Sequence, residues 1–210
     1  MKAEQFFTQE ENKKITATIK DVESRTDGEI AVMVVDSSNH YHEAEVLGGV
    51  VLGSLLALIV TILFFRDSLW IYIALSIIFF FPFGLLCARV PKLKAAFLSV
   101  KKKEEMVRLR ALRAFYEKSL YKTRHHTGVL FFISLLERKV WVLADKGIYK
   151  KMDQETLNQF AGMVSQGIKE GRACEVSLCQ AIEEIGRLLA EHFPHTPGYV
   201  DQLPDQVLTE

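Results

Sequence analysis

Two long apolar stretches interrupt an otherwise charged chain and constrain its fold more than any other feature. They run over Val46–Phe65 and Leu69–Ala88, and only Arg66-Asp67-Ser68 separates them. Each holds twenty residues without a charged side chain, which matches a hydrocarbon core of about 30 Å at about 1.5 Å per helical residue. A chain of 210 residues has too little amphipathic sequence to bury both stretches in a soluble core. The pattern predicts a transmembrane helical hairpin.

The distribution of basic side chains predicts the orientation of this hairpin. Seven Lys or Arg residues lie from Arg89 to Arg108, whereas none lies between Asp27 and Glu45. Because cytoplasmic flanks of membrane spans are enriched in Lys and Arg, the basic flank is expected in the cytoplasm. Two spans return the chain to the side on which it started. We therefore expect a multi-pass protein of the cell inner membrane, with both termini and the polar domain in the cytoplasm and the lipid bilayer as its partner.

The two apolar stretches have the composition of an anchor. Neither contains Asp, Glu, Lys, Arg or His, whereas transport paths usually need an ionisable or strongly polar group at membrane depth. Gly49, Gly53 and Ala57 recur every four residues and predict a close approach of the second helix. The 26 acidic and 26 basic side chains cancel, so no basic field indicates a nucleic-acid partner. The N-terminus lacks a signal-peptide pattern, and Cys87, Cys174 and Cys179 lack metal-ligand spacing and are interpreted as reduced thiols.

The rest of the sequence predicts one α/β domain that the hairpin divides into two parts. Residues 1–45 contain a helix over Gln9–Arg25, with Thr8 and Glu11 as a capping box, and a buried strand over Glu29–Asp36. Residues 46–88 form the membrane hairpin, and residues 89–194 hold the second part of the domain. There, Val129–Leu136 and Val140–Ala144 are expected to form a β-hairpin next to the first strand.

Helices are expected to cover this mixed sheet on its faces. A long helix over Lys92–Tyr121 connects the membrane hairpin to the second strand, which makes the first two strands parallel. Two further amphipathic helices follow, over Asp153–Glu170 and Glu175–His192, the first with Asp153 as N-cap. Residues 195–210 contain two prolines and lack periodicity, so they are interpreted as a tail.

The run from Thr123 to Ile148, TRHHTGVLFFISLLERKVWVLADKGI, resembles the middle of the TPM domain family. Phe193-Pro194 and Asp201-Gln202-Leu203-Pro204 resemble a membrane-bound bacterial branch of it. The resemblance covers nearly all of the chain outside the membrane hairpin and implies a compact α/β sandwich. Members of the family are linked to calcium binding, acid phosphatase activity and maintenance of membrane complexes, so the resemblance implies the fold more directly than one reaction.

The predicted topology brings polar residues together at one edge of the sheet. The starts of the first two strands and the end of the third meet there, which places Glu29, Arg124 and Asp145 side by side. Carboxylates suit Ca²⁺ or another divalent cation, with Glu29 and Asp145 as candidate ligands, and Arg124 suits phosphate. Further candidates at or near this edge are Asp27, His125, Thr127, Lys146 and Asp153.

Structural roles compete with binding for each of these residues. Asp145 suits a tight turn with Gly147, and Arg124 suits an ordinary ion pair. His125 and His126 are adjacent and point apart on an extended chain. No nucleophile motif is present. We therefore expect an accessory or interaction module, with other membrane proteins as candidate partners. The alternative is a metal-assisted phosphatase or a divalent-cation-binding domain.

Overall fold

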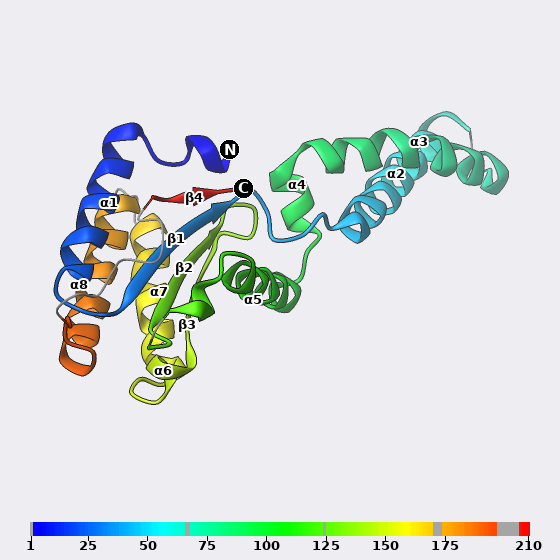
Figure 1. Cartoon of the computed structure of the whole chain (residues 1–210). Helices are drawn as coiled ribbons and strands as arrows, with labels where there is room; N and C mark the ends of the chain where they lie inside the picture. Colours follow the sequence, from blue (N-terminus) through cyan, green and yellow to red (C-terminus); the bar gives the residue numbers. More distant parts are fainter. Residues whose placement is uncertain (1, 66–67, 124, 170–173, 197–205) are drawn as a thin grey trace. The chain divides into compact units, whose positions relative to one another are not determined.

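The computed structural model describes residues 2–65, 68–123, 125–169, 174–196 and 206–210, and the chain divides into two compact units. The first unit combines residues 1–38 with residues 104–210, and the second comprises residues 39–103. Figure 1 labels the helices and strands and colours the chain from its N-terminus to its C-terminus. The second unit contains both of the apolar stretches, and its limits are wider than theirs.

A four-stranded mixed sheet forms the centre of the first unit. Its strands are β1 (Glu29–Val35), β2 (Gly128–Ser134), β3 (Lys139–Ala144) and β4 (Leu208–Thr209). They lie in the order β3-β2-β1-β4, with β1 parallel to β2 and β4, and β3 antiparallel to β2. The predicted parallel pair and β-hairpin are confirmed. The interpretation of residues 195–210 as a tail was wrong for the end of the chain, because β4 adds an edge strand.

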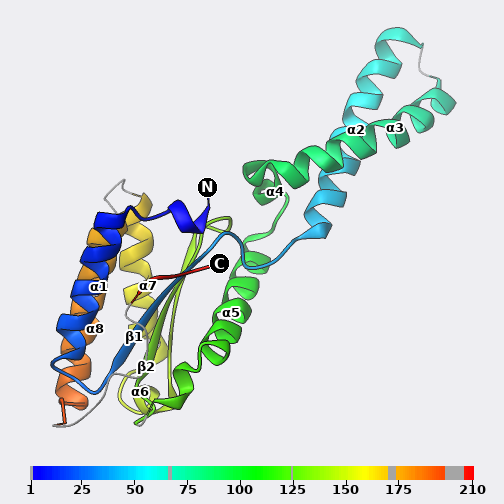
Figure 2. The same cartoon turned by 45° about the horizontal axis from the view of Figure 1, so that its top comes forward.

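The side chains of β1 alternate between two cores. Ile30, Val32 and Val34 pack toward α1 (Gln9–Glu23), α7 (Gln154–Lys169) and α8 (Cys174–His192). Ala31 and Met33 pack on the other face, against α5 (Val100–Glu117). Figure 2 shows the helices on the two sides of the sheet. Burial on both faces explains why β1 is a continuous apolar run and not an alternating one.

Several local predictions are confirmed. Thr8 and Glu11 form the capping box of α1, in which the Thr8 amide donates to Glu11 Oε2 at 2.6 Å. Asp153 caps α7, because its Oδ1 accepts the Thr156 amide at 2.8 Å. Short one-turn helices complete the unit. They are η1 (Ala3–Gln5), η2 (Leu120–Lys122) and α6 (Lys146–Tyr149).

The predicted long helix over Lys92–Tyr121 is interrupted. It is replaced by α4 (Pro91–Ala96), α5 and η2. The break lies at Ser99, whose hydroxyl accepts the Lys102 amide at 3.2 Å and whose carbonyl accepts the Lys103 amide at 3.1 Å. A serine side chain that accepts a backbone amide favours a new helix start over a continuous helix.

The second unit contains α2 (His42–Phe64) and α3 (Leu69–Arg89), both long and apolar enough to cross a membrane. The two helices pack through the small-residue stripe of α2. Gly49, Gly53 and Ala57 are buried, and a Cβ on Gly53 would lie 3.0 Å from the backbone nitrogen of Phe80. The predicted stripe therefore lets the two helix backbones approach closely.

Candidate functional site

The predicted edge of the sheet is present, and β-sheet register brings its parts together. Glu29 at the start of β1 pairs with Gly128 at the start of β2, and Val129 pairs with Ala144 at the end of β3. The Asp145 amide then donates to the Gly128 carbonyl at 2.9 Å. The edge therefore carries polar residues from three strand ends, as the predicted topology requires.

Asp27 accepts hydrogen bonds on both of its carboxylate oxygens at this edge. It is buried just before β1, and both of its oxygens accept hydrogen bonds from Thr196, from the amide at 2.8 Å and from the hydroxyl at 2.7 Å. Its backbone carbonyl accepts the Thr127 hydroxyl at 2.7 Å. Asp27 thus joins the start of β1 to the residues after α8 and to the loop before β2.

Two histidines lie close to the Asp27 carboxylate. His125 Nε2 is 3.8 Å from Oδ2, and His195 Nδ1 is 3.7 Å from Oδ1. Burial raises the pKa of Asp27, but the Thr196 hydrogen bonds and the charge of the two histidines together outweigh it and hold that pKa below its usual value. Asp27 is therefore an ionised carboxylate held by hydrogen bonds within the domain.

Asp145 also has local partners on both carboxylate oxygens. Its Oδ1 accepts the Lys146 amide at 2.6 Å and caps α6, and its Oδ2 lies 3.1 Å from His126 Nδ1. His126 has a positive φ of 56°, and its carbonyl accepts the Gly147 amide at 3.0 Å. A Cβ on Gly147 would clash with the His125 and His126 carbonyls, so this close approach needs glycine.

The two adjacent histidines lie close to different carboxylates, although the backbone at His126 is left-handed and not extended as the sequence argument assumed. His125 approaches Asp27, whereas His126 approaches Asp145. His195 and Thr196 were not predicted as site residues, although both lie close to the Asp27 carboxylate. The adjoining Phe193-Pro194 was noted only for its resemblance, and the contact joins residues separated by 169 positions.

The remaining candidates have separate surroundings. Glu29 is buried at the start of β1, where its amide donates to the Thr127 carbonyl at 3.2 Å. Lys146 is exposed, and Arg124 lies outside the described residues. Asp153 is exposed, and hydrogen bonds from Thr156 lower its pKa. It lies in an open groove of about 490 Å³ whose lining residues are Tyr149, Lys150, Lys151, Met152, Asp153, Thr156, Leu188 and His192.

Metal coordination would require several ligands to converge. Within the described part of the chain, no three His, Cys, Asp or Glu residues are grouped so that they could hold a metal ion. The predicted pair of metal ligands, Glu29 and Asp145, therefore stays a prediction. The observed geometry at this edge is a set of hydrogen bonds that join strand ends to neighbouring loops.

A second polar group lies at the opposite edge, around the turn between β2 and β3. Glu137 lies in this turn and is buried. Its Oε1 accepts the Ser38 amide at 2.9 Å, and its Oε2 accepts the Ser134 hydroxyl. The Ser38 hydroxyl donates to Ser134 Oγ at 2.9 Å. These bonds fasten the segment after β1 to the β2–β3 turn.

Comparison with solved structures supports the fold. The chain is similar to the BA42 protein from the psychrophilic bacterium Bizionia argentinensis, with a TM-score of 0.62 and 20% sequence identity. The match covers 100% of this chain and 99% of that one. No family model matches the sequence, and neither does any curated protein. At this identity the likeness concerns the arrangement of the backbone and carries no function with it.

Proposed function

We propose that this protein is a membrane-anchored α/β domain that acts as an accessory or interaction module at the cytoplasmic face. The observation that carries the proposal is the exposed apolar surface of α2 and α3. Leu63, Phe64 and Trp70 are 69%, 73% and 81% exposed within the chain, and the two helices have mean hydropathies of 2.7 and 2.4. An apolar surface of this extent in water would drive aggregation, whereas a bilayer covers it.

The distribution of basic residues in the sequence supports the orientation. The basic residues from Arg89 to Arg108 follow α3 directly, and Lys or Arg near a membrane span favours the cytoplasmic side. With two spans, the α/β domain and both termini are then in the cytoplasm, in a multi-pass protein of the inner membrane.

The resemblance of residues 123–148 to the TPM domain family supports the further proposal that this domain is TPM-like.

The module is favoured over a hydrolase by the state of the edge carboxylates. Asp27 and Asp145 each have hydrogen-bond or ion-pair partners on both oxygens. Carboxylates that already accept hydrogen bonds from loops and strand ends are suited to stabilising the conformation of the surface around them. Such a surface can recognise a neighbouring membrane protein without turnover.

Membrane fractionation tests the anchoring. The full chain is expected in the membrane pellet after alkaline carbonate washing, and a variant in which a Gly/Ser linker replaces residues 42–89 is expected in the soluble fraction. Recovery of the full chain in the carbonate supernatant would contradict the proposal. The linker variant also tests the domain division, because β1 and β2 pair without residues of α2 or α3.

A phosphatase assay separates the module from the metal-assisted hydrolase. Detergent-purified full chain is incubated with an aryl phosphate, with and without added Ca²⁺ or Mg²⁺. The module predicts no turnover above that of the Asp145→Ala variant. Cation-dependent turnover that this variant loses would instead establish the hydrolase.

A further inference from the structure

The helix that follows the membrane hairpin has apolar residues on two of its faces. The inner face of α5, formed by Val107, Ala111, Ala114 and Phe115, is buried against the sheet. The outer surface carries Leu109, Leu112 and Tyr116, which are 50%, 40% and 58% exposed. A helix that packs on one face of a sheet and is otherwise exposed to solvent normally carries polar residues on its outer side. Packing in the core of the domain therefore does not explain why these three exposed residues are apolar.

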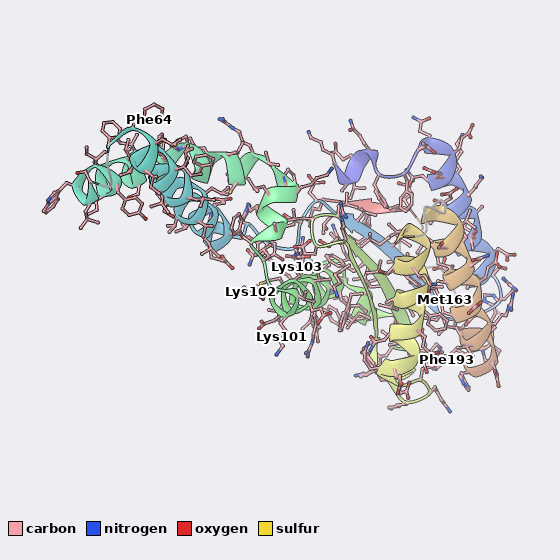
Figure 3. The ribbon with its side chains drawn as sticks, turned by 180° about the vertical axis from the view of Figure 1, so that it is seen from behind. Phe64, Lys101, Lys102, Lys103, Met163 and Phe193 are labelled. Carbon is pink, nitrogen blue, oxygen red and sulfur yellow. The ribbon has the colours of Figure 1, made fainter. Side chains whose placement is uncertain are left out.

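Basic residues accompany this exposed apolar stripe. α5 contains three lysines and three arginines against three glutamates. Lys101, Lys102 and Arg108 are exposed, and Figure 3 labels the consecutive lysines at the start of the helix. Lys102 also lies 3.6 Å from Glu43, but its side chain is still 44% exposed. An exposed apolar stripe bordered by Lys and Arg is typical of helices that lie in a membrane interface.

Aromatic residues extend the stripe beyond the end of α5. The rings of Tyr116 and Tyr121 have centroids 5.3 Å apart, and Lys122 Nζ is 5.7 Å from the Tyr121 ring centroid. Tyrosines are enriched at the headgroup level of bilayers because their rings are apolar and their hydroxyls are wet. The lysine adds a cation at the same place. Basic side chains therefore lie beside exposed apolar surface both at the start of α5 and just after its end.

We propose that the outer surface of α5, defined by Leu109, Leu112 and Tyr116 with Lys101, Lys102 and Arg108, binds the anionic surface of the bilayer. The inference rests on the proposed anchoring by α2 and α3. Only ten residues separate the end of α3 from the start of α5, so the chain limits their separation to about 40 Å. Such tethering gives a high effective concentration of lipid headgroups at α5.

Lipid nanodiscs allow a direct test with the full chain. In a background in which alanine replaces Cys87, Cys174 and Cys179, Leu109→Cys is labelled with the environment-sensitive fluorophore NBD. The protein is reconstituted in discs of phosphatidylcholine alone or of phosphatidylcholine with phosphatidylglycerol. The expected result is brighter, blue-shifted emission in the anionic discs. The matched control is Val176→Cys on α8, because Val176 is 47% exposed and its helix packs on the opposite face of the sheet. Its emission should be equal in both discs.

Removal of the basic charges on α5 provides a second test of the inference. Each basic residue near an anionic surface contributes roughly fivefold to partitioning, so replacing Lys101, Lys102 and Arg108 with glutamine should weaken it roughly a hundredfold. The blue shift at position 109 should then disappear, as it should at high salt. A chain that elutes with the discs but emits as in water at position 109 would overturn this inference alone. A blue shift at that position only in native membranes would identify a protein partner and also overturn it. A chain that fails to elute with the discs would contradict the anchoring itself.

Discussion

The Asp27 carboxylate accepts two hydrogen bonds from Thr196, one from its amide and one from its hydroxyl, across 169 positions of sequence. The same segment is held at Thr26, whose hydroxyl donates to the Phe193 carbonyl at 2.6 Å, and at Asp27, whose amide donates to it at 3.0 Å. The end of α8 is thus fastened to the start of β1 by a charged group and two neutral hydrogen bonds. Charge-assisted hydrogen bonds are the stronger kind, so Asp27 dominates this connection.

Replacement of Asp27 by asparagine should reduce stability in a pH-dependent way. Because the pKa of Asp27 is lowered in the folded protein, its contribution is present above the ordinary aspartate pKa of about 3.9 and is lost as the pH falls through the lowered value. We expect Asp27→Asn to cost about 1–3 kcal/mol at neutral pH, and the difference from wild type to shrink in acid. Thermal unfolding of the full chain in detergent, measured from neutral to acidic pH, checks this.

Asp21→Asn is a suitable control for this experiment. Asp21 forms an ion pair with Arg25 at 2.7 Å, but its side chain is 69% exposed. Exposed pairs contribute little to stability, so this variant should unfold as wild type does at every pH. Equal losses in the two variants would show that Asp27 contributes only as a surface charge.

The contact between α2 and α3 predicts an unequal response of two glycines. Substitution of helical glycine by alanine normally favours the helix by up to about 1 kcal/mol. At Gly53 the new Cβ would lie 3.0–3.2 Å from backbone atoms of Phe79 and Phe80, whereas at Gly84 the nearest atom, the Glu45 carbonyl oxygen, is 3.8 Å away. Gly53→Ala should therefore loosen the helix pair and lower its melting temperature in detergent, and Gly84→Ala should not. Identical behaviour of the two variants would contradict the close packing.

Sequence patterns predicted the parts of this fold that local chemistry determines. The Thr8–Glu11 capping box, the Asp153 cap and the continuous apolar run of β1 depend on neighbours within a few residues. The position of β4 does not, since Leu208 and Thr209 form a strand only because β1 offers a free edge. Burial of Glu137 likewise depends on Ser38, almost a hundred residues earlier. Contacts of this kind leave no periodicity in the sequence.

The same distinction applies to the candidate site. Topology correctly brought the ends of β1, β2 and β3 to one edge, and Asp27, Thr127 and Asp145 lie there. The partners of these side chains were harder to predict. Thr196 and His195 follow α8 in the chain and lie beside Asp27, and His126 contacts Asp145 from a left-handed backbone conformation.

Membrane topology should be measurable with single cysteines. In a cysteine-free background, Ser68→Cys lies in the Arg66-Asp67-Ser68 turn, which the predicted orientation puts outside the cell membrane, and Glu210→Cys lies at the C-terminus. If the basic flank after α3 is cytoplasmic, an impermeant maleimide should label position 68 in intact cells and should label position 210 only after lysis. Labelling of position 210 in intact cells would reverse the proposed orientation. The pair serves as its own control, because lysed cells must give labelling at both sites.

Substitutions of Asp145 distinguish a structural role of this edge from ligand binding, because the two carboxylate oxygens of Asp145 have different partners. Oδ1 accepts the Lys146 amide and caps α6, whereas Oδ2 faces His126. Asparagine keeps the cap, so Asp145→Asn should stay within about 1 kcal/mol of wild type, and Asp145→Ala should lose about 0.5–2 kcal/mol as the cap is removed. If the edge has only a structural role, Ca²⁺, Mg²⁺ and inorganic phosphate should leave the melting temperatures of the wild type and of both variants unchanged. A ligand that binds only the folded state raises the melting temperature, and the stabilisation grows with the logarithm of 1 + [L]/Kd. Stabilisation of wild type by one of these ions, lost in Asp145→Asn while the unliganded stability is retained, would therefore assign the edge to ligand binding and overturn the structural role.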